Sequence, residues 1–70
     1  MAAFYSCKIP VPAPGELTTA TWTWEHLDRP EAEALSRAEA VKAGFTVRRT
    51  AWARTDPRTH RLTVALEVVI

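Results

Sequence analysis

The sequence predicts a small α+β domain in the order strand, strand, helix, strand, strand, with one helix packed on an antiparallel or mixed four-stranded sheet. Three observations lead to this fold class. Apolar or β-branched residues alternate at a period of two in four stretches, a capped helical segment separates the second stretch from the third, and an Asp-Pro turn joins the last two. We expect residues 1–70 to form a single domain, because a chain of this length has room for one core.

The first strand is expected at residues 3–11, at the edge of the sheet. Pro10 and Pro12 lack the N–H that a central strand must donate, so the strand should lie at an edge and stop near Pro12. Residues 10–15 are rich in proline and predict a stiff connector. The odd positions alternate with polar ones and are expected to face the core: Tyr5, Cys7, Ile9 and Val11.

The second strand is expected at residues 18–26, where threonines alternate with larger or apolar side chains. Trp22 and Trp24 fall on the same face of this strand because they are two residues apart. Each indole buries on the order of 200 Å². The face that carries them therefore needs a surface to pack against.

The helix is expected at about residues 29–43. Asp28 is an N-cap candidate, and Glu31 three positions later completes a capping box. Gly44 is expected to end the helix at the C′ position, with Phe45 making the apolar contact that follows such an end. The residues expected to form the apolar face are Ala34, Leu35, Ala38 and Val41.

The C-terminal hairpin is expected at residues 45–70, with its turn at Asp56-Pro57, a favoured pair for the first two positions of a type I turn. In its first strand, strict alternation would place Arg49 on the Phe45 face. Either Arg49 lies at a sheet margin, or a β-bulge near residues 48–49 moves Trp52 onto the Phe45 face. The second strand lines one face with Leu62, Val64, Leu66, Val68 and Ile70.

Composition excludes several classes of protein. The net charge is +1, but residues 1–41 hold three basic and six acidic side chains, whereas residues 42–70 hold six basic and two acidic ones. One cysteine rules out an intrachain disulfide and a site built on several thiolates. Apolar runs are too short for a membrane span, and we see no signal peptide pattern, so we expect a cytoplasmic location and no membrane partner.

A partner chain is expected because one alanine-rich helix is too small to cover both faces of a four-stranded sheet. We therefore predict a small protein-interaction module that forms a homo-oligomer and binds another protein. Its size also fits a phage or mobile-element accessory protein that modulates a protein target. The expected interface residues are Trp22, Trp24, Trp52, Val69 and Ile70, although a tryptophan in a small domain is first of all a core residue.

Nucleic-acid binding is the alternative function. A basic two-stranded ribbon with an aromatic residue can enter a major groove or hold phosphates. The simpler interpretation is that charged side chains keep a hairpin soluble and prevent indiscriminate strand pairing. The residues expected to contact nucleic acid are Arg48, Arg54, Arg58, His60 and Arg61.

Enzymatic activity has little support in the sequence. A nucleophilic site would need Cys7 beside a histidine with a third orienting group, and His26 and His60 lie in different predicted elements. These three residues also show no recognised metal-ligand spacing. We expect no enzyme, no cofactor and no metal site.

Overall fold

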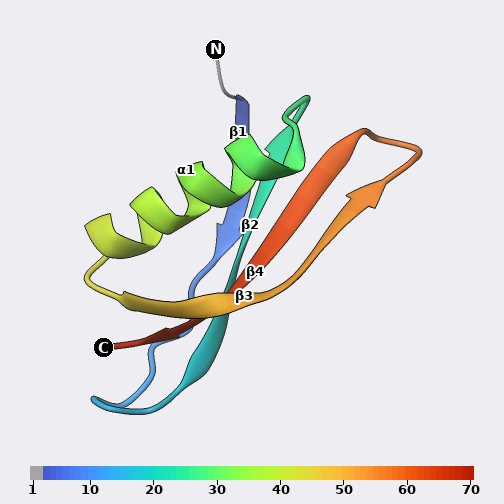
Figure 1. Cartoon of the computed structure of the whole chain (residues 1–70). Helices are drawn as coiled ribbons and strands as arrows, with labels where there is room; N and C mark the ends of the chain where they lie inside the picture. Colours follow the sequence, from blue (N-terminus) through green and yellow to red (C-terminus); the bar gives the residue numbers. More distant parts are fainter. Residues whose placement is uncertain (1–2) are drawn as a thin grey trace.

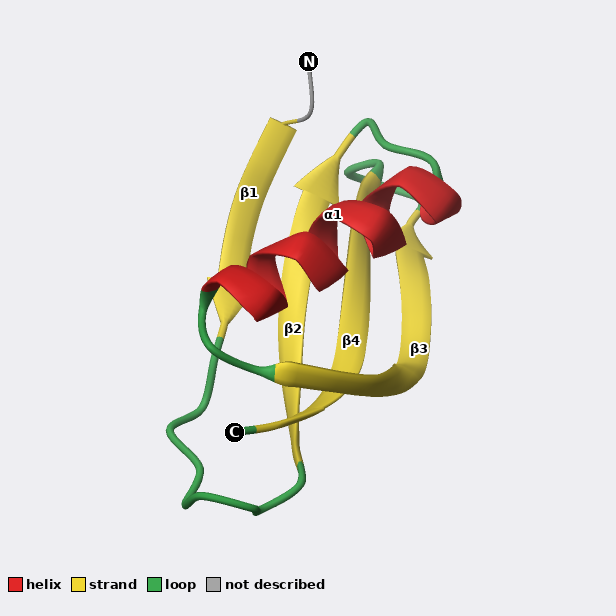
Figure 2. Cartoon of the chain, turned by 60° about the vertical axis from the view of Figure 1, so that its left-hand side comes forward, coloured by secondary structure: helices red, strands yellow, loops and turns green. Residues whose placement is uncertain are grey.

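The computed structural model describes residues 3–70, with side chains from Ser6 onward. It contains β1 (Ala3–Lys8), β2 (Thr18–Glu25), α1 (Arg29–Lys42), β3 (Thr46–Asp56) and β4 (Arg61–Val69). All neighbouring strands are antiparallel, in the order β1-β2-β4-β3, and α1 crosses one face of this single sheet (Figures 1 and 2). The predicted α+β fold is confirmed, with an antiparallel sheet.

The edge strand β1 is shorter and less buried than expected. It ends at Lys8, two residues before Pro10, and its pairing with β2 is irregular between Phe4 and Ser6. The expectation that Cys7 faces the core is wrong: Cys7 lies opposite Trp22 in register but is exposed. The reason is that α1 lies over β2, β4 and β3 and does not extend its close contacts to the edge strand β1. Ile9 and Val11 are likewise exposed, and the side chain of Tyr5 lies outside the described residues.

The core lies between α1 and the sheet, and large strand residues face small helix residues across it. The indoles of Trp22 and Trp24 are almost fully buried and supply much of the volume. The indole N–H of Trp24 donates a hydrogen bond of 2.8 Å to the Ser36 hydroxyl of α1. The other buried apolar residues from the strands are Ala20, Leu62, Val64, Leu66 and Val68.

The face of α1 that meets the sheet differs from the expected one. Ala32, Ser36 and Ala40 are fully buried, whereas Ala34, Ala38 and Val41 are exposed and only Leu35 of the expected set packs against the core. Small residues are needed at the contact because the two indoles already fill the space between the layers. Volume, rather than the hydrophobicity of single helix residues, therefore sets the rotation of α1.

The two ends of α1 follow the predicted positions. Asp28 has the extended backbone of an N-cap residue, but within the described part of the chain it makes no side-chain capping bond. At the other end Gly44 adopts φ +95°, and the Phe45 N–H bonds the Ala40 carbonyl at 3.0 Å. Together with the bond from Gly44 N–H to the Val41 carbonyl, this is a Schellman motif.

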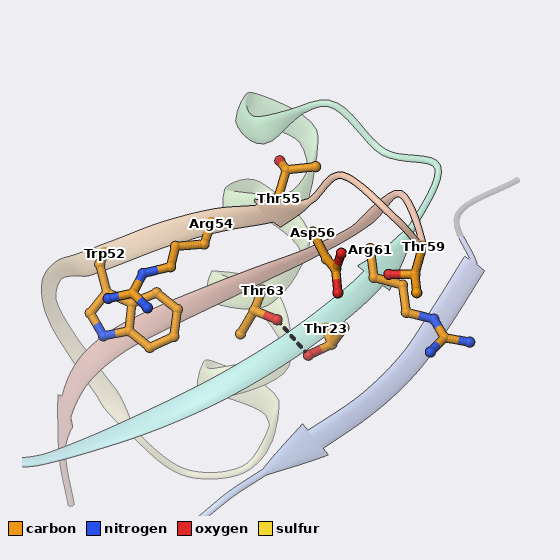
Figure 3. Close-up of a pocket in the computed structure, with 8 residues that line it drawn as sticks. All are labelled: Thr23, Trp52, Arg54, Thr55, Asp56, Thr59, Arg61 and Thr63. Carbon is orange, nitrogen blue, oxygen red and sulfur yellow. Dashed lines mark hydrogen bonds between the residues drawn. The ribbon is translucent and has the colours of Figure 1, made fainter.

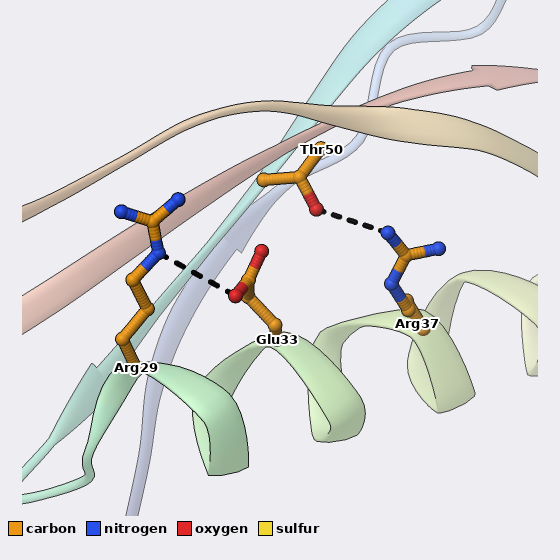
Figure 4. A network of polar contacts seen from close by, with 4 residues as sticks. All are labelled: Arg29, Glu33, Arg37 and Thr50. Carbon is orange, nitrogen blue, oxygen red and sulfur yellow. Dashed lines mark hydrogen bonds and ion pairs between the residues drawn. The ribbon is translucent and has the colours of Figure 1, made fainter.

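Polar contacts add to the attachment of α1. Figure 4 shows Arg29 paired with Glu33 at 3.4 Å, one helical turn apart, and Arg37 donating to the Thr50 hydroxyl of β3 at 3.1 Å. The first contact lies along the helix surface, and the second joins the helix to the sheet. No helix within residues 3–70 has the length and apolar character needed to cross a membrane.

The edge strand β3 contains two irregularities, and they resolve the position of Arg49. Val47 pairs with Val68 and Arg49 with Glu67, so Arg48 is an extra residue; a second shift leaves Ala51 extra. The first bulge moves Arg49 off the helix-bearing face, as the bulge hypothesis required. The second restores the original phase, so Trp52 lies on the face opposite Phe45 rather than with it. β3 bends strongly along its length, as bulged strands do (Figure 2).

The turn between β3 and β4 is where the sequence predicts it. The Asp56 carboxylate accepts a 2.8 Å bond from the Arg58 N–H, and the Asp56 carbonyl accepts one of 2.9 Å from the His60 N–H. His60 closes the turn with φ +57°, in the left-handed region. This local bonding by Asp56 is the mechanism expected for an Asp-Pro turn.

Candidate functional site

The face of the sheet opposite α1, which we call the open face, is largely polar. Successive side chains of a strand point to opposite faces, so the residues that alternate with the core residues lie on the open face. Those of β2 are mostly threonines, and one ion pair joins β3 to β4 while another joins β4 to β2. The residues of β2, β3 and β4 on the open face are Thr19, Thr21, Thr23, Glu25, Thr46, Arg49, Trp52, Arg54, Asp56, Arg61, Thr63, Ala65, Glu67 and Val69.

Trp52 is the large apolar side chain near the middle of this face. It is 38% exposed and lies opposite Ala65 of β4 in the register. Ala65 is fully buried although it lies on the open face, as expected where a cross-strand indole covers a methyl group. The guanidinium of Arg54 lies 4.8 Å from the centre of the Trp52 ring, close enough for a cation–π interaction. Trp52 is therefore restrained on both sides while its outer surface meets solvent.

A shallow hollow of about 400 Å³ adjoins Trp52. In Figure 3, Trp52 and Arg54 lie at one end of it and Arg61 and Thr59 at the other. Between them, the hydroxyl groups of Thr23 and Thr63 share a 2.9 Å hydrogen bond across β2 and β4. The hollow thus offers an aromatic surface, hydroxyl groups and a guanidinium within one concave region.

Two ion pairs reduce the positive charge of the open face. Arg49 contacts the Glu67 carboxylate at 2.6 Å, and Arg61 lies 3.6 Å from that of Glu25. The hydrogen bond that Arg49 donates to the Glu67 carboxylate, together with the negative charge of Glu67, raises the pKa of Arg49 above the ordinary value for an arginine. The face consequently presents alternating charges rather than a continuous basic surface.

The residues predicted to bind nucleic acid are divided between two ends of the hairpin. Arg48 is exposed at the first bulge of β3, whereas Arg58 and His60 are exposed in the turn. About eight strand residues separate these sites, which corresponds to roughly 25 Å. Arg54 and Arg61 lie between them on the open face, with Arg54 stacked on Trp52 and Arg61 near Glu25.

The residues predicted to form a protein interface are likewise divided. Trp22 and Trp24 are buried under α1, so they belong to the core and are inaccessible to a partner in this structure. Trp52 is accessible on the open face, and Ile70 is 55% exposed at the C-terminus. Val69 is partly buried at a second hollow of about 380 Å³, whose lining also includes Gly15, Leu17, Arg48, Arg49 and Glu67.

The structure brings His26 and His60 together, which the sequence analysis did not foresee. Their ring centres are 6.4 Å apart with planes inclined by 25°, and the His26 N–H lies 3.4 Å from the His60 carbonyl. His26 and His60 are adjacent in sequence to Glu25 and Arg61, which form the last cross-strand pair of β2 and β4. A prediction of the β2–β4 register would have revealed this proximity, since residues 26 and 60 are next in that register.

Cys7 and the histidines do not form a nucleophilic arrangement. Cys7 lies opposite Trp22, four residues before His26 along β2, which is roughly 13 Å. Across the described residues, no group of three or more His, Cys, Asp or Glu side chains is arranged to hold a metal ion. The open face and the histidine pair therefore remain the places with distinctive side-chain chemistry.

Comparisons with protein-family models, with curated proteins and with solved structures each find no match to this chain.

Proposed function

We propose that the protein is a small interaction module that binds a second copy of itself through the open face, with Trp52 at the centre of the contact. The observation that carries this proposal is the position of Trp52, exposed on the helix-free face, restrained by Arg54 and adjacent to a hollow. Tryptophan and arginine are enriched among the residues that dominate binding energy at protein interfaces. A restrained indole also loses little conformational entropy on binding.

The charge pattern of the open face suits a symmetric pair. A two-fold interface brings the same surface together twice, so it must be complementary to itself. Arg49 beside Glu67 and Arg61 beside Glu25 provide both signs of charge on this surface. Rotation of one copy relative to the other can therefore place basic groups against acidic ones.

The area that such a pair requires is a modest fraction of the surface of this small molecule. A standard interface buries about 800 Å² on each partner. The accessible surface is 4647 Å² in all, so this contact would take about one sixth of it. A partner on the open face would also leave α1 and its attachment to the sheet unchanged.

Sedimentation velocity over a range of protein concentrations tests the proposal. We expect the wild-type mass to rise with concentration and Trp52→Glu to remain monomeric. Both copies of a two-fold pair lose the anchor, so a loss of about 2 kcal/mol for each weakens dimerisation by roughly 1,000-fold. The matched control is Val41→Glu, which adds the same charge to the 65%-exposed Val41 on the outer side of α1 and should dimerise as the wild type does.

Two outcomes would contradict this proposal. A wild-type chain that stays monomeric into the high micromolar range has no self-association of the proposed kind. Equal weakening by Trp52→Glu and Val41→Glu would show that the effect comes from added charge and does not depend on the open face. Thermal unfolding of both variants establishes that each remains folded.

Single-stranded nucleic acid is a second candidate, favoured by the stacked Trp52 and Arg54 on an open sheet. Bases stack on exposed aromatic rings and on guanidinium planes in many such proteins. Quenching of Trp52 fluorescence by an oligonucleotide, lost at high salt, would support it. For the predicted duplex contact through the hairpin, changing Arg58 and Arg61 to Glu should abolish salt-dependent binding of duplex DNA.

A further inference from the structure

The histidine pair lies on the surface where β2 ends and β4 begins. His26 and His60 are both exposed, come from positions 34 residues apart in the sequence and place their rings 6.4 Å apart. Each adopts a positive φ, of 56° and 57°, and within residues 3–70 they are the non-glycine residues that do so. The backbone contact between His26 and His60 holds the two Cα atoms in a fixed relation.

We propose that His26 and His60 together chelate one divalent transition-metal ion, such as Ni²⁺, Cu²⁺ or Zn²⁺. Neutral imidazole is a preferred ligand of these three ions. Both rings are accessible from solvent, so an ion reaches them without any opening of the fold. This site is separate from Trp52 and does not depend on the function proposed for the open face.

The backbone places the two rings within reach of one ion, and the side chains must turn to bind it. Metal–nitrogen bonds of about 2.0–2.1 Å in a tetrahedral arrangement place two imidazole centres about 5 Å apart. The observed rings are 6.4 Å apart and stacked, with planes inclined by 25°, so they must approach by about 1 Å and also turn until one nitrogen of each points at the shared ion, which rotation about the side-chain bonds of two exposed residues allows. The fixed backbone means that binding by one ring brings the second within reach of the same ion.

Two protein ligands define the kind of site. They leave the remaining coordination positions to water or to a donor from another molecule, as in an exchangeable site rather than a closed structural one. Arg58 and Arg61 flank His60 in the sequence, and Glu25 offsets Arg61 through their 3.6 Å contact. Ligation by imidazole nitrogen, rather than attraction by net charge, therefore drives binding.

Calorimetric titration of the tag-free chain with NiCl₂ or ZnCl₂ tests the chelate. A Cys7→Ser background removes the exposed thiol as a competing ligand. The variants are His26→Asn and His60→Asn, because asparagine tolerates the left-handed backbone and lacks the imidazole. We expect each single variant to weaken binding about 100-fold, since the second ligand acts at high effective concentration.

The double variant distinguishes a chelate from two separate sites. In a chelate, either substitution alone removes most of the affinity, so the double variant is only slightly weaker than each single one. Strictly additive losses, or wild-type binding no tighter than that of a single variant, would overturn the proposal. Circular dichroism of each variant reports whether it folds.

A second measurement uses the unmutated ligands. Paramagnetic broadening of the NMR spectrum by a small amount of Cu²⁺ should first remove the signals of His26 and His60 and of their neighbours. Broadening that is centred elsewhere on the chain would refute the site even if an asparagine variant failed to fold.

Discussion

The rotation of α1 provides a sharp test, because Ala38 and Ala40 are two residues apart and face different environments. Ala40 is fully buried against the sheet, whereas Ala38 is exposed. Ala40→Leu forces three additional carbon atoms into the closed space beside the indoles. Overpacking of this kind costs about 1–3 kcal/mol. Ala38→Leu makes the same chemical change on the solvent side, where substitutions stay within about 0.5 kcal/mol.

Thermal unfolding followed by circular dichroism measures the difference. For a domain of this size, 1 kcal/mol shifts Tm by about 4–8 °C, so Ala40→Leu should lower Tm by roughly 5–20 °C. Ala38→Leu should change it by only a few degrees, because leucine and alanine have similar helix propensities. Equal shifts for the two variants would contradict the observed rotation of α1, and a larger loss for Ala38→Leu would show that α1 presents the face that the sequence pattern indicates.

Three further predictions concern Gly44, Cys7 and Ser36. Gly44→Ala should lower the free energy of unfolding in urea by about 1 kcal/mol, because φ is +95° at this position, and Gly44→Asn should lower it less. Equal stability of the wild type and both variants would contradict the left-handed conformation of Gly44. Cys7 should react with a thiol reagent at the rate of an exposed cysteine without denaturant, and slow reaction that needs unfolding would mean that it is buried. Ser36→Ala removes the 2.8 Å hydrogen bond from Trp24 and should lower the free energy of unfolding by about 1–3 kcal/mol. In a Trp24→Phe background, which already lacks this bond, the same substitution should lower it less. An equal loss in both backgrounds would show that the bond contributes little.

The order and approximate bounds of the elements could be predicted because each depends on local signals. The Schellman motif needs only a glycine after the last turn, and Gly44 with Phe45 supplies both parts. The turn depends on the bonding of Asp56, which is also local. The second strand could be predicted from the alternation of its residues alone, and Trp22 and Trp24 do face the core.

The rotation of α1 could not be predicted because it depends on contacts between layers. Ala34, Ala38 and Val41 form a periodic pattern, but the decisive quantity is the volume left by Trp22 and Trp24. The prediction that Cys7 is buried was wrong for a related reason. Alternation placed Cys7 correctly on the helix-bearing side of the sheet, but how far α1 extends across that side depends on contacts between elements distant in the sequence.

Most of the candidate site was also beyond the sequence. Strict alternation placed Trp52 and Arg54 on the same side, opposite Phe45, and the structure has them there. It could not decide whether a bulge at Arg48 moves Arg49 to the side of Glu67, and it could not indicate the second bulge at Ala51 that returns Trp52 to its original side. The nearness of His26 to His60 depends on the register between β2 and β4, which is fixed by residues far apart in the chain.

The two bulges in β3 have a consequence for how copies of this molecule can assemble. A bent strand with unpaired extra residues is a poor template for a further strand, and Arg48 projects a charge at the same place. A sheet can extend through many copies only if both of its edge strands can pair with a strand of another copy. If β3 does not accept a strand, edge-to-edge pairing can use only β1, which joins two copies and leaves no further edge for a longer ribbon.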